Sequence, residues 1–415
     1  MIEGKIIKFY REKKRRTQGE LVKGICSVTH LSKIERGMTE YSQEIMDMLC
    51  ERLHIDMVRE VTRYHQMKEL LDTWQEAIIM QRTAEAIRLK DKLEEEPLTG
   101  IPDLRLSCDL LRIRFYLFMN NIDEAEKHID KIEIPDELEH SYEYYFYHHL
   151  MGIYYFLTGH YAKSIQTLTS IDQSKYTNHE YFYHLSLAYH SIYSNITSYY
   201  YAEKAIQHFR KTLNMVRIID TETIMLVQLN SREYHDFPET KRRYDNLIRI
   251  CDDCGLPDRK AKLLNNLGYE YNRRNQYEDA AYWYREALDI IPEEQPLYLM
   301  VLNNYIETSR LGSLMPANKL LDLSLEALRQ SDLVEDASYM ELELQCVILQ
   351  GQEKAYYQMI EERVLPYYRE LGSKYLAERY EEILFQYYMD HGEKDKALHL
   401  AKNRFETQTT TLISG

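Results

Sequence analysis

The sequence predicts an all-α protein with a small helical unit at the N-terminus followed by a long array of paired helices. Gly and Pro number only 14 and 9 among 415 residues, so the chain has few turn-forming residues for its length. A pattern of small and aromatic residues also recurs about every 34–40 residues, which is typical of stacked helix pairs. Both observations favour helices joined by short loops over sandwiches, barrels or doubly wound sheets.

The charge of the chain is divided unevenly along its length. The net charge is −15, yet residues 1–36 contain ten Lys and Arg against four acids, so that the remaining residues carry −21. A basic segment on an acidic chain can be attracted to phosphate on its own. The N-terminus lacks the apolar stretch of a signal peptide, and no run approaches the ~18 apolar residues of a membrane span. We therefore expect a cytoplasmic protein with no membrane partner and with free thiols.

The N-terminal unit, residues 1–64 and here called the head, contains the boundary signals of four short helices. Thr17 and Glu20 form a capping box at the start of the second helix. Gly24 then supplies a turn, Ser27 caps the third helix, and Gly37 ends it. The expected helices cover residues 5–14, 18–23, 28–35 and 42–53. Their tight turn between the second and third helices predicts a helix-turn-helix domain, a class that binds double-stranded DNA.

The stretch TQGELVKGICSVTHLSKIERG, residues 17–37, resembles the signature of the Xre/Cro-type helix-turn-helix repressors. In that signature, Thr/Ser-Gln-x-x-Leu leads to Ser-(Lys/Arg)-Ile-Glu-x-Gly. The resemblance implies that Gln18 bonds a phosphate and that the outward face of the third helix meets base edges in the major groove. The DNA-binding residues predicted in this way are Arg15, Arg16, Gln18, Ser27, Val28, Thr29, Ser32, Lys33 and Arg36.

Individual roles follow from side-chain chemistry. Lys33 could donate to guanine O6 or N7, and Val28 could pack on a thymine methyl group. Arg36 and the Arg15–Arg16 pair are better placed for phosphates, whereas Glu35 is expected to form an ion pair within the head. Val28 stands where polar side chains are common in the family. Two interpretations of it therefore stay open, a base contact and a core residue.

Residues 65–415 are predicted to form tetratricopeptide (TPR) repeats. In residues 262–292, small residues would let two helices approach closely while aromatic rings fill the gap to the next pair. Asn275 replaces the usual Gly of the inter-helix turn, and Asn tolerates a left-handed backbone. The residues at TPR spacing are Leu267, Gly268, Tyr271, Tyr277, Ala280, Tyr284, Ala287 and Pro292.

Weaker copies of this pattern predict helix pairs that begin near residues 66, 106, 142, 180, 222, 262, 298, 338 and 376. The expected architecture is thus a right-handed TPR superhelix of about nine repeats. An irregular all-α bundle is the alternative.

The inner groove of such a superhelix is the candidate ligand site. An extended peptide exposes unsatisfied N–H and C=O groups, and one Asn amide can serve both. Counting back from Ala280 places Asn265, Tyr269 and Asn272 on the groove face, and Arg114 could receive a carboxylate. For each residue, a solvated or interhelical polar group is the alternative. The predicted peptide-binding residues are Arg114, His149, Asn230, Asn265, Tyr269, Asn272, Asn303 and Asn304.

An Xre-type head followed by about nine TPRs resembles the peptide-quorum-sensing regulators of Gram-positive bacteria. These are the Rap, NprR, PlcR, PrgX and Rgg group, and the NprR type is the most similar. The resemblance implies a homo-dimer or tetramer that controls transcription in response to a short signalling peptide. A Rap-like module that sequesters a sporulation phosphorelay response regulator is the alternative function, possible also as a peptide-free activity. A phage or plasmid repressor is a third.

Motifs for catalysis or metal binding are few. Cys251 and Cys254 form one CxxC without a second pair or a suitably spaced His. The sequence contains neither a Gly-rich phosphate loop nor the patterns H-E-x-x-H and G-x-S-x-G. We therefore expect no enzymatic activity, no metal and no cofactor.

Overall fold

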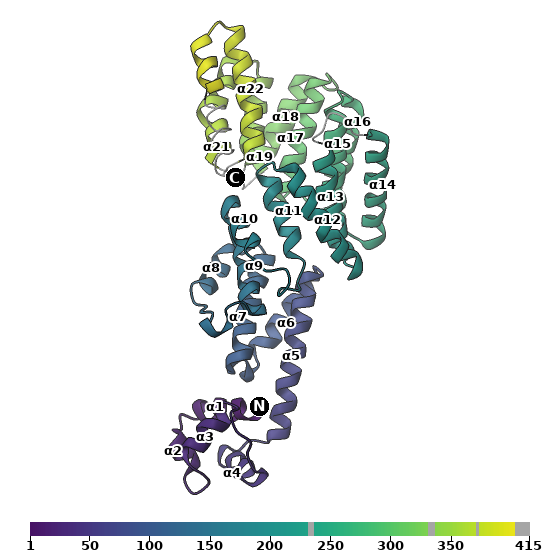
Figure 1. Cartoon of the computed structure of the whole chain (residues 1–415). Helices are drawn as coiled ribbons and strands as arrows, with labels where there is room; N and C mark the ends of the chain where they lie inside the picture. Colours follow the sequence, from purple (N-terminus) through teal and green to yellow (C-terminus); the bar gives the residue numbers. More distant parts are fainter. Residues whose placement is uncertain (231–235, 331–336, 371–372, 403–415) are drawn as a thin grey trace. The chain divides into compact units, whose positions relative to one another are not determined.

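A computed structural model describes residues 1–230, 236–330, 337–370 and 373–402 of the chain (Figure 1). Within these ranges all regular secondary structure is helical, which confirms the expected all-α class. The chain divides into two compact units, Met1–Tyr181 and Phe182–Gly415. Each unit is described by itself below.

The head begins with four short helices, and their boundary signals are those expected from the sequence. Both hydrogen bonds of the capping box between Thr17 and Glu20 are present. Ser27 Oγ accepts a hydrogen bond from the backbone N–H of His30, and Gly37 adopts a left-handed φ of 67°. The first helix starts three residues earlier than expected. The helices are α1 (Ile2–Lys13), α2 (Gln18–Val22), α3 (Val28–Glu35) and α4 (Gln43–Leu53).

Helices α1 to α4 enclose one apolar core, which includes Ile7, Leu21, Leu31 and Leu49. Gly4 allows α1 to approach α3 closely, because a Cβ atom at this position would lie 2.0 Å from the carbonyl oxygen of Ile34. The helix-turn-helix pair, α2 and α3, is therefore held from behind by α1.

The rest of the first unit consists of helix pairs. Helix α5 is 23 residues long and continues without interruption past residue 64, so the domain boundary placed there stays a prediction. The elements are α5 (Met57–Ile79), α6 (Thr83–Glu94), η1 (Pro97–Gly100), α7 (Pro102–Phe118), α8 (Ile122–Ile129), η2 (Asp136–Leu138), α9 (Tyr142–Leu157), α10 (Tyr161–Thr169) and the first residue of α11 (Tyr181–Ser191).

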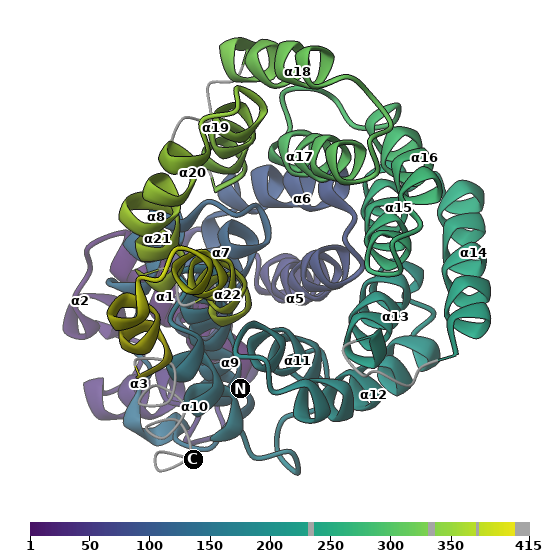
Figure 2. The same ribbon diagram turned by 90° about the horizontal axis from the view of Figure 1, so that it is seen from above.

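In the second unit, Figure 2 shows α11, α13, α15 and α17 on the inner side of an arc and α12, α14, α16 and α18 on its outer side. The further elements are α12 (Asn195–Lys211), α13 (Met215–Asn230), α14 (Phe237–Cys254), α15 (Pro257–Asn272), α16 (Tyr277–Leu288), α17 (Pro296–Leu311), α18 (Ala317–Gln330), α19 (Ala337–Leu349), α20 (Glu353–Met359), η3 (Ile360–Val364), α21 (Leu365–Glu370) and α22 (Lys374–Asp390). The first helices of the pairs begin at residues 57, 102, 142, 181, 215, 257, 296, 337 and 374. Six of these starts lie within four residues of the expected positions, whereas the helices that begin at 57, 215 and 257 start five to nine residues earlier than expected.

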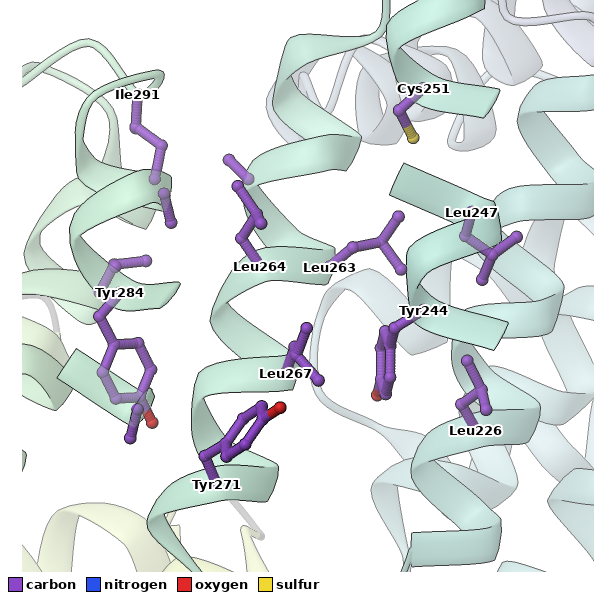
Figure 3. Packing of buried hydrophobic residues seen from close by; sticks show 14 of the residues in the cluster. Leu226, Tyr244, Leu247, Cys251, Leu263, Leu264, Leu267, Tyr271, Tyr284 and Ile291 are labelled. Carbon is purple, nitrogen blue, oxygen red and sulfur yellow. The ribbon is translucent and has the colours of Figure 1, made fainter. Parts of the chain in front are cut away.

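Close packing within the repeats also agrees with the sequence pattern. A Cβ atom on Gly268 of α15 would lie 2.8 Å from Cε1 of Tyr284 in α16, so only glycine permits this approach without movement of the ring. On the other side of α15, Leu267 faces Tyr244 of α14 (Figure 3). Asn275 has a left-handed φ of 56° in the turn between α15 and α16, as expected.

Candidate DNA-binding surface and peptide pocket

Helix α3 presents a polar, exposed face. Thr29 and Lys33 are exposed, and Ser32 is half-buried. Val28 is 46% exposed, so the interpretation of Val28 as a core residue is wrong. An exposed apolar side chain at the start of α3 could contact a thymine methyl group, as the sequence predicts.

A buried ion pair supports this face from below. Glu35 accepts from Arg11 Nε at 2.6 Å and from Arg11 Nη2 at 3.1 Å, which confirms its expected role as an ion-pair partner within the head. Gln18 Nε2 donates to the same carboxylate at 2.8 Å. An amide nitrogen has two N–H donors, and the other donor is the one that our prediction assigns to a phosphate.

Basic side chains surround α2 and α3. Arg15 and Arg36 are exposed, and Arg16 is half-buried. Arg36 donates to the carbonyl oxygen and to the hydroxyl of Ser32 at 3.1 Å, and Arg16 donates to the carbonyl oxygen of Arg52. With Ser27, which is exposed and caps α3, all nine predicted DNA-binding residues lie on or beside the helix-turn-helix. Their DNA-binding roles stay predictions.

Two predicted peptide-binding residues of the first unit lie in the interior. Arg114 is 3% exposed, and its Nη2 donates to both carboxylate oxygens of Glu180 at 3.0 and 3.1 Å. His149 is fully buried, and its Nδ1 lies 2.9 Å from the hydroxyl oxygen of Tyr176. The expectation that these side chains project into an open groove is therefore wrong, because a carboxylate and a hydroxyl of the chain itself already contact them.

The Asn residues of successive repeats bond to neighbouring repeats. Asn265 is 6% exposed, and its Oδ1 accepts from Asn304 Nδ2 at 2.9 Å. Asn303 is also buried and donates from Nδ2 to Glu341 Oε2 at 2.9 Å. The expectation that Asn265 faces an open groove is therefore wrong, since its amide connects α15 to α17. Asn272 is half-buried at the end of α15. Asn230 ends α13, and its side chain lies outside the described residues.

The second unit contains a cavity of about 450 Å³ beside α15. Of the predicted peptide-binding residues, only Tyr269 lines this cavity. Asn266, Tyr269, Glu270 and Arg273 have the spacing i, i+3, i+4 and i+7, which places them along one face of a helix. The stripe predicted from the sequence, with Asn265 and Asn272, is rotated by one residue from this face. The lining residues are His190, Tyr193, Asn195, Val227, Gln228, Tyr244, Asn266, Tyr269, Glu270 and Arg273.

The cavity combines aromatic rings, amides and compensated charges. Burial lowers the pKa of His190 despite its hydrogen bond with Gln228. Gln228 Nε2 lies 2.7 Å from His190 Nδ1, so the amide of α13 contacts the imidazole of α11 directly. Glu270 Oε2 accepts from Arg274 Nη1 at 2.7 Å, and Arg273 Nη1 lies 3.7 Å from Glu270 Oε1. This mixture of rings, amides and a nearby guanidinium is suited to a polar organic ligand such as a peptide.

Other chemistries find little support in the described ranges. There, no three or more His, Cys, Asp or Glu side chains are grouped to hold a metal ion. No helix in these ranges combines the length and the apolar character needed to cross a membrane. All six cysteines are free.

A helix-turn-helix head joined to TPR-like helix pairs is the architecture of the two-part regulators, in which a DNA-binding unit is combined with helical repeats. Comparison with known proteins supports this class, although no family model matches the chain. In sequence, the chain is similar to the transcriptional activator NprA of Geobacillus stearothermophilus. The two are 22% identical over 386 residues, which cover 88% of this chain and 93% of NprA.

In structure, the chain is similar to the quorum sensor NprR in complex with its cognate peptide NprX. The TM-score is 0.63 at 18% identity, covering 83% of this chain and 99% of NprR. A Rap protein complexed with competence and sporulation factor gives a TM-score of 0.67 at 14% identity, covering 83% of this chain and 98% of the Rap chain. The chain therefore has the helical-repeat fold of the NprR and Rap proteins.

Proposed function

We propose that the protein is a transcriptional regulator whose DNA binding is controlled by a short signalling peptide bound in its repeats. The observation that carries this proposal is the coexistence of an exposed α3 face with the cavity beside α15. The likeness to a transcriptional activator and to a peptide-bound quorum sensor supports the same assignment. In this proposal the protein acts in the cytoplasm as a regulator and not as an enzyme.

The head would supply DNA recognition. Val28, Thr29, Ser32 and Lys33 would meet base edges, while Gln18, Arg15, Arg16 and Arg36 would bond phosphates. A single head buries too little surface for tight specific binding, so two heads on paired half-sites are expected. We therefore infer a homo-dimer or tetramer as the DNA-binding form.

The cavity beside α15 would supply peptide recognition. Asn266 can bond both an N–H and a C=O group of a peptide backbone through its one amide. The ring of Tyr269 offers an apolar surface to a ligand side chain. Arg273 has a side chain that is 38% exposed, and its guanidinium would receive a ligand carboxylate.

Adjacent asparagines on α15 provide the test of this assignment. Peptides selected on the full chain from a random heptapeptide library would be titrated into the wild type and two variants by calorimetry. Asn266→Ala should weaken binding by about three- to tenfold, because one or two hydrogen bonds to the ligand are removed. Asn265→Ala should leave the affinity unchanged and lower the melting temperature, because it removes the hydrogen bond from Asn304. The peptide site would have to be placed elsewhere if Asn266→Ala bound as tightly as the wild type.

Control of DNA binding by the peptide needs a separate measurement. DNA fragments selected by the full chain from a random duplex pool would be bound with and without the selected peptides. The proposal expects peptide to change the DNA affinity of the wild type but to have little effect on Asn266→Ala. An equal response of both chains would contradict control through this cavity.

A Rap-like activity is the second candidate function, and the shared fold with a Rap protein favours it. The peptide-free chain would bind a response regulator of the sporulation phosphorelay. Size-exclusion chromatography of the full chain mixed with purified response regulators tests this, and co-elution that peptide abolishes is the expected result. Separate elution at high micromolar concentrations would argue against it.

A further inference from the structure

Helix α1 of the head contacts α5 and α7 through polar side chains. Lys5 Nζ lies 2.9 Å from Asp103 Oδ2 at the start of α7, and the hydroxyl of Tyr64 donates to the same carboxylate. Tyr10 donates from its hydroxyl to Glu60 Oε2 of α5 at 2.8 Å. Residues of α1 are thus bonded to two helices outside the helix-turn-helix.

An aromatic contact accompanies these bonds. A Cβ atom on Gly100 of η1 would lie 2.7 Å from Cε2 of Phe9, so the ring packs directly on the η1 backbone. Arg63 of α5 donates to Glu96 Oε2 at 3.0 Å just before η1, which connects α5 to the segment that the ring touches. The contact therefore joins α1, α5, η1 and α7 in one continuous patch.

Helix α1 is also the helix that holds α3. Gly4 permits the backbone of α1 to touch the carbonyl oxygen of Ile34, and Arg11 forms the buried ion pair with Glu35. One helix therefore contacts α3 on one side and α5, η1 and α7 on the other. A rotation of these elements would be transmitted to α3 through α1.

We propose that the patch formed by Lys5, Phe9, Tyr10, Glu60, Gly100 and Asp103, here called the head latch, holds the head, α5, η1 and the start of α7 as one rigid body. The direction in which α3 faces is then set by the repeats and not by a flexible tether. In a dimer, latched heads would accept only half-sites at a fixed separation. This inference rests on the contacts of α1 alone and holds whether or not the cavity beside α15 binds a peptide.

The latch has a part that solvent ions can weaken and a part that they cannot. The side chains of Lys5 and Asp103 are 45% and 35% exposed, so salt screens their attraction. Glu60 is buried, and Phe9 is half-buried against η1. Replacing Lys5 removes the exposed ion pair with Asp103, whereas a side chain at position 100 would push against the ring of Phe9. The two substitutions therefore perturb the latch independently.

Pulsed electron spin resonance on the full chain tests the latch. Spin labels would be attached at Met48→Cys on α4 and Ile87→Cys on α6, both exposed positions. Cys26 and Cys254, the two cysteines that are not buried, would be replaced by Ser. The otherwise unaltered chain should give one narrow distance distribution. Lys5→Met and Gly100→Ala should each broaden it to about twice its width or more, because the head then samples several orientations.

Lys8→Met is the matched control, since Lys8 is an exposed lysine on the same helix, and its distribution should stay narrow. Thermal unfolding followed by circular dichroism reports whether each variant is folded. Lys5→Met alters only an exposed side chain, so it remains informative if Gly100→Ala disturbs η1. The proposal would be overturned by a broad distance distribution between the labels in the chain with an unaltered latch. It would also be overturned by a narrow distance distribution in folded Lys5→Met at low salt.

Discussion

At the scale of single residues, Glu341 is an unusual carboxylate. It accepts hydrogen bonds from Asn303 Nδ2 at 2.9 Å and from the hydroxyls of Tyr368 and Tyr380 at 2.6 and 3.2 Å. Burial nevertheless raises the pKa of Glu341 above its usual range. The folded state thus binds the proton more readily than the unfolded state does. The resulting contribution to stability is complete below the pKa of the unfolded chain and is lost as the pH rises through the folded-state pKa.

Glu341→Gln should therefore raise the melting temperature near pH 7 by about 1–3 °C. The amide keeps the size of the side chain without the cost of a buried charge, and the two tyrosine hydroxyls can reorient to suit it. Differential scanning calorimetry from mildly acidic to neutral pH should show the gain shrinking as the pH falls. Glu353→Gln, at an exposed position of α20, is the control and should not change the melting temperature. A lower melting temperature for Glu341→Gln at pH 7 would mean that the ionised carboxylate stabilises the fold.

Two glycines of the head differ in the space around them, which gives a second prediction. A methyl group on Gly4 would meet the carbonyl oxygen of Ile34 at 2.0 Å, whereas at Gly19 the nearest atoms are 4.0 Å away. Gly4→Ala should destabilise the head by ~1–3 kcal/mol, because the α3 backbone must move. Gly19→Ala should be neutral or stabilising by up to ~1 kcal/mol, as alanine favours helix. Hydrogen exchange of the segments within residues 2–53 measures both, and equal protection in the two variants would refute the close approach of α1 and α3.

Asn265 illustrates the limit of inference from sequence at this scale. Periodicity selected α15, one face of which lines the cavity, but a helical stripe more than 100° wide does not separate Asn265 from Asn266. The hydrogen bond that distinguishes them comes from Asn304, 39 residues away. Arg114 and Glu180 are a comparable case, since a partner 66 residues distant leaves no local trace in the sequence.

At the scale of the element, α3 gives the third prediction. Lys33→Ala and Thr29→Ala should each weaken binding to selected DNA by ~1–3 kcal/mol for every base that the shortened side chain no longer reaches. Neither change should alter thermal stability, because both side chains are exposed. Fluorescence anisotropy with labelled duplex measures the affinity, with Lys131→Ala beyond α8 as the control. If both variants bound DNA with wild-type affinity, Thr29 and Lys33 would not contact the bases.

The elements themselves were largely predictable. Caps at Thr17 and Ser27 and the glycine at position 37 are local signals, so the boundaries of α2 and α3 could be inferred from the sequence. Helix α5 was harder to delimit because it has no boundary signal near residue 64 and continues to Ile79. Its true start is marked by Asp56, whose carboxylate accepts a hydrogen bond from the backbone N–H of Arg59.

At the scale of the whole molecule, the separation of charge predicts how DNA binding responds to salt. The head is basic and the remainder is acidic, so affinity for any duplex should come mainly from phosphate contacts of the head. Log affinity should fall linearly with log salt, and Arg15→Ala or Arg36→Ala should each reduce the slope by ~1. Anisotropy titrations at several salt concentrations provide the slopes. A response that is flat in salt would exclude the phosphate contacts assigned here.

Within the described residues, the succession of helix pairs could be predicted because each pair repeats the same local pattern. The division into two compact units between Tyr181 and Phe182 could not, since it depends on contacts among distant segments. The cavity beside α15 was missed for the same reason, because its lining comes from α11 to α15 and no single helix carries a motif for it.

The uninterrupted course of α5 has a consequence for exchanging heads between related regulators. The helix contains neither Gly nor Pro along its 23 residues, so it has no built-in joint at which a misaligned graft could adjust. One residue inserted between Met67 and Leu71 would turn everything beyond it by about 100° and separate Lys5 from Asp103. Seven inserted residues would restore the facing to within about 20° but leave an offset of about 10 Å along the axis. The rotation of α5 at the junction thus decides in which chimaeras a head from another regulator can form the contacts of the head latch.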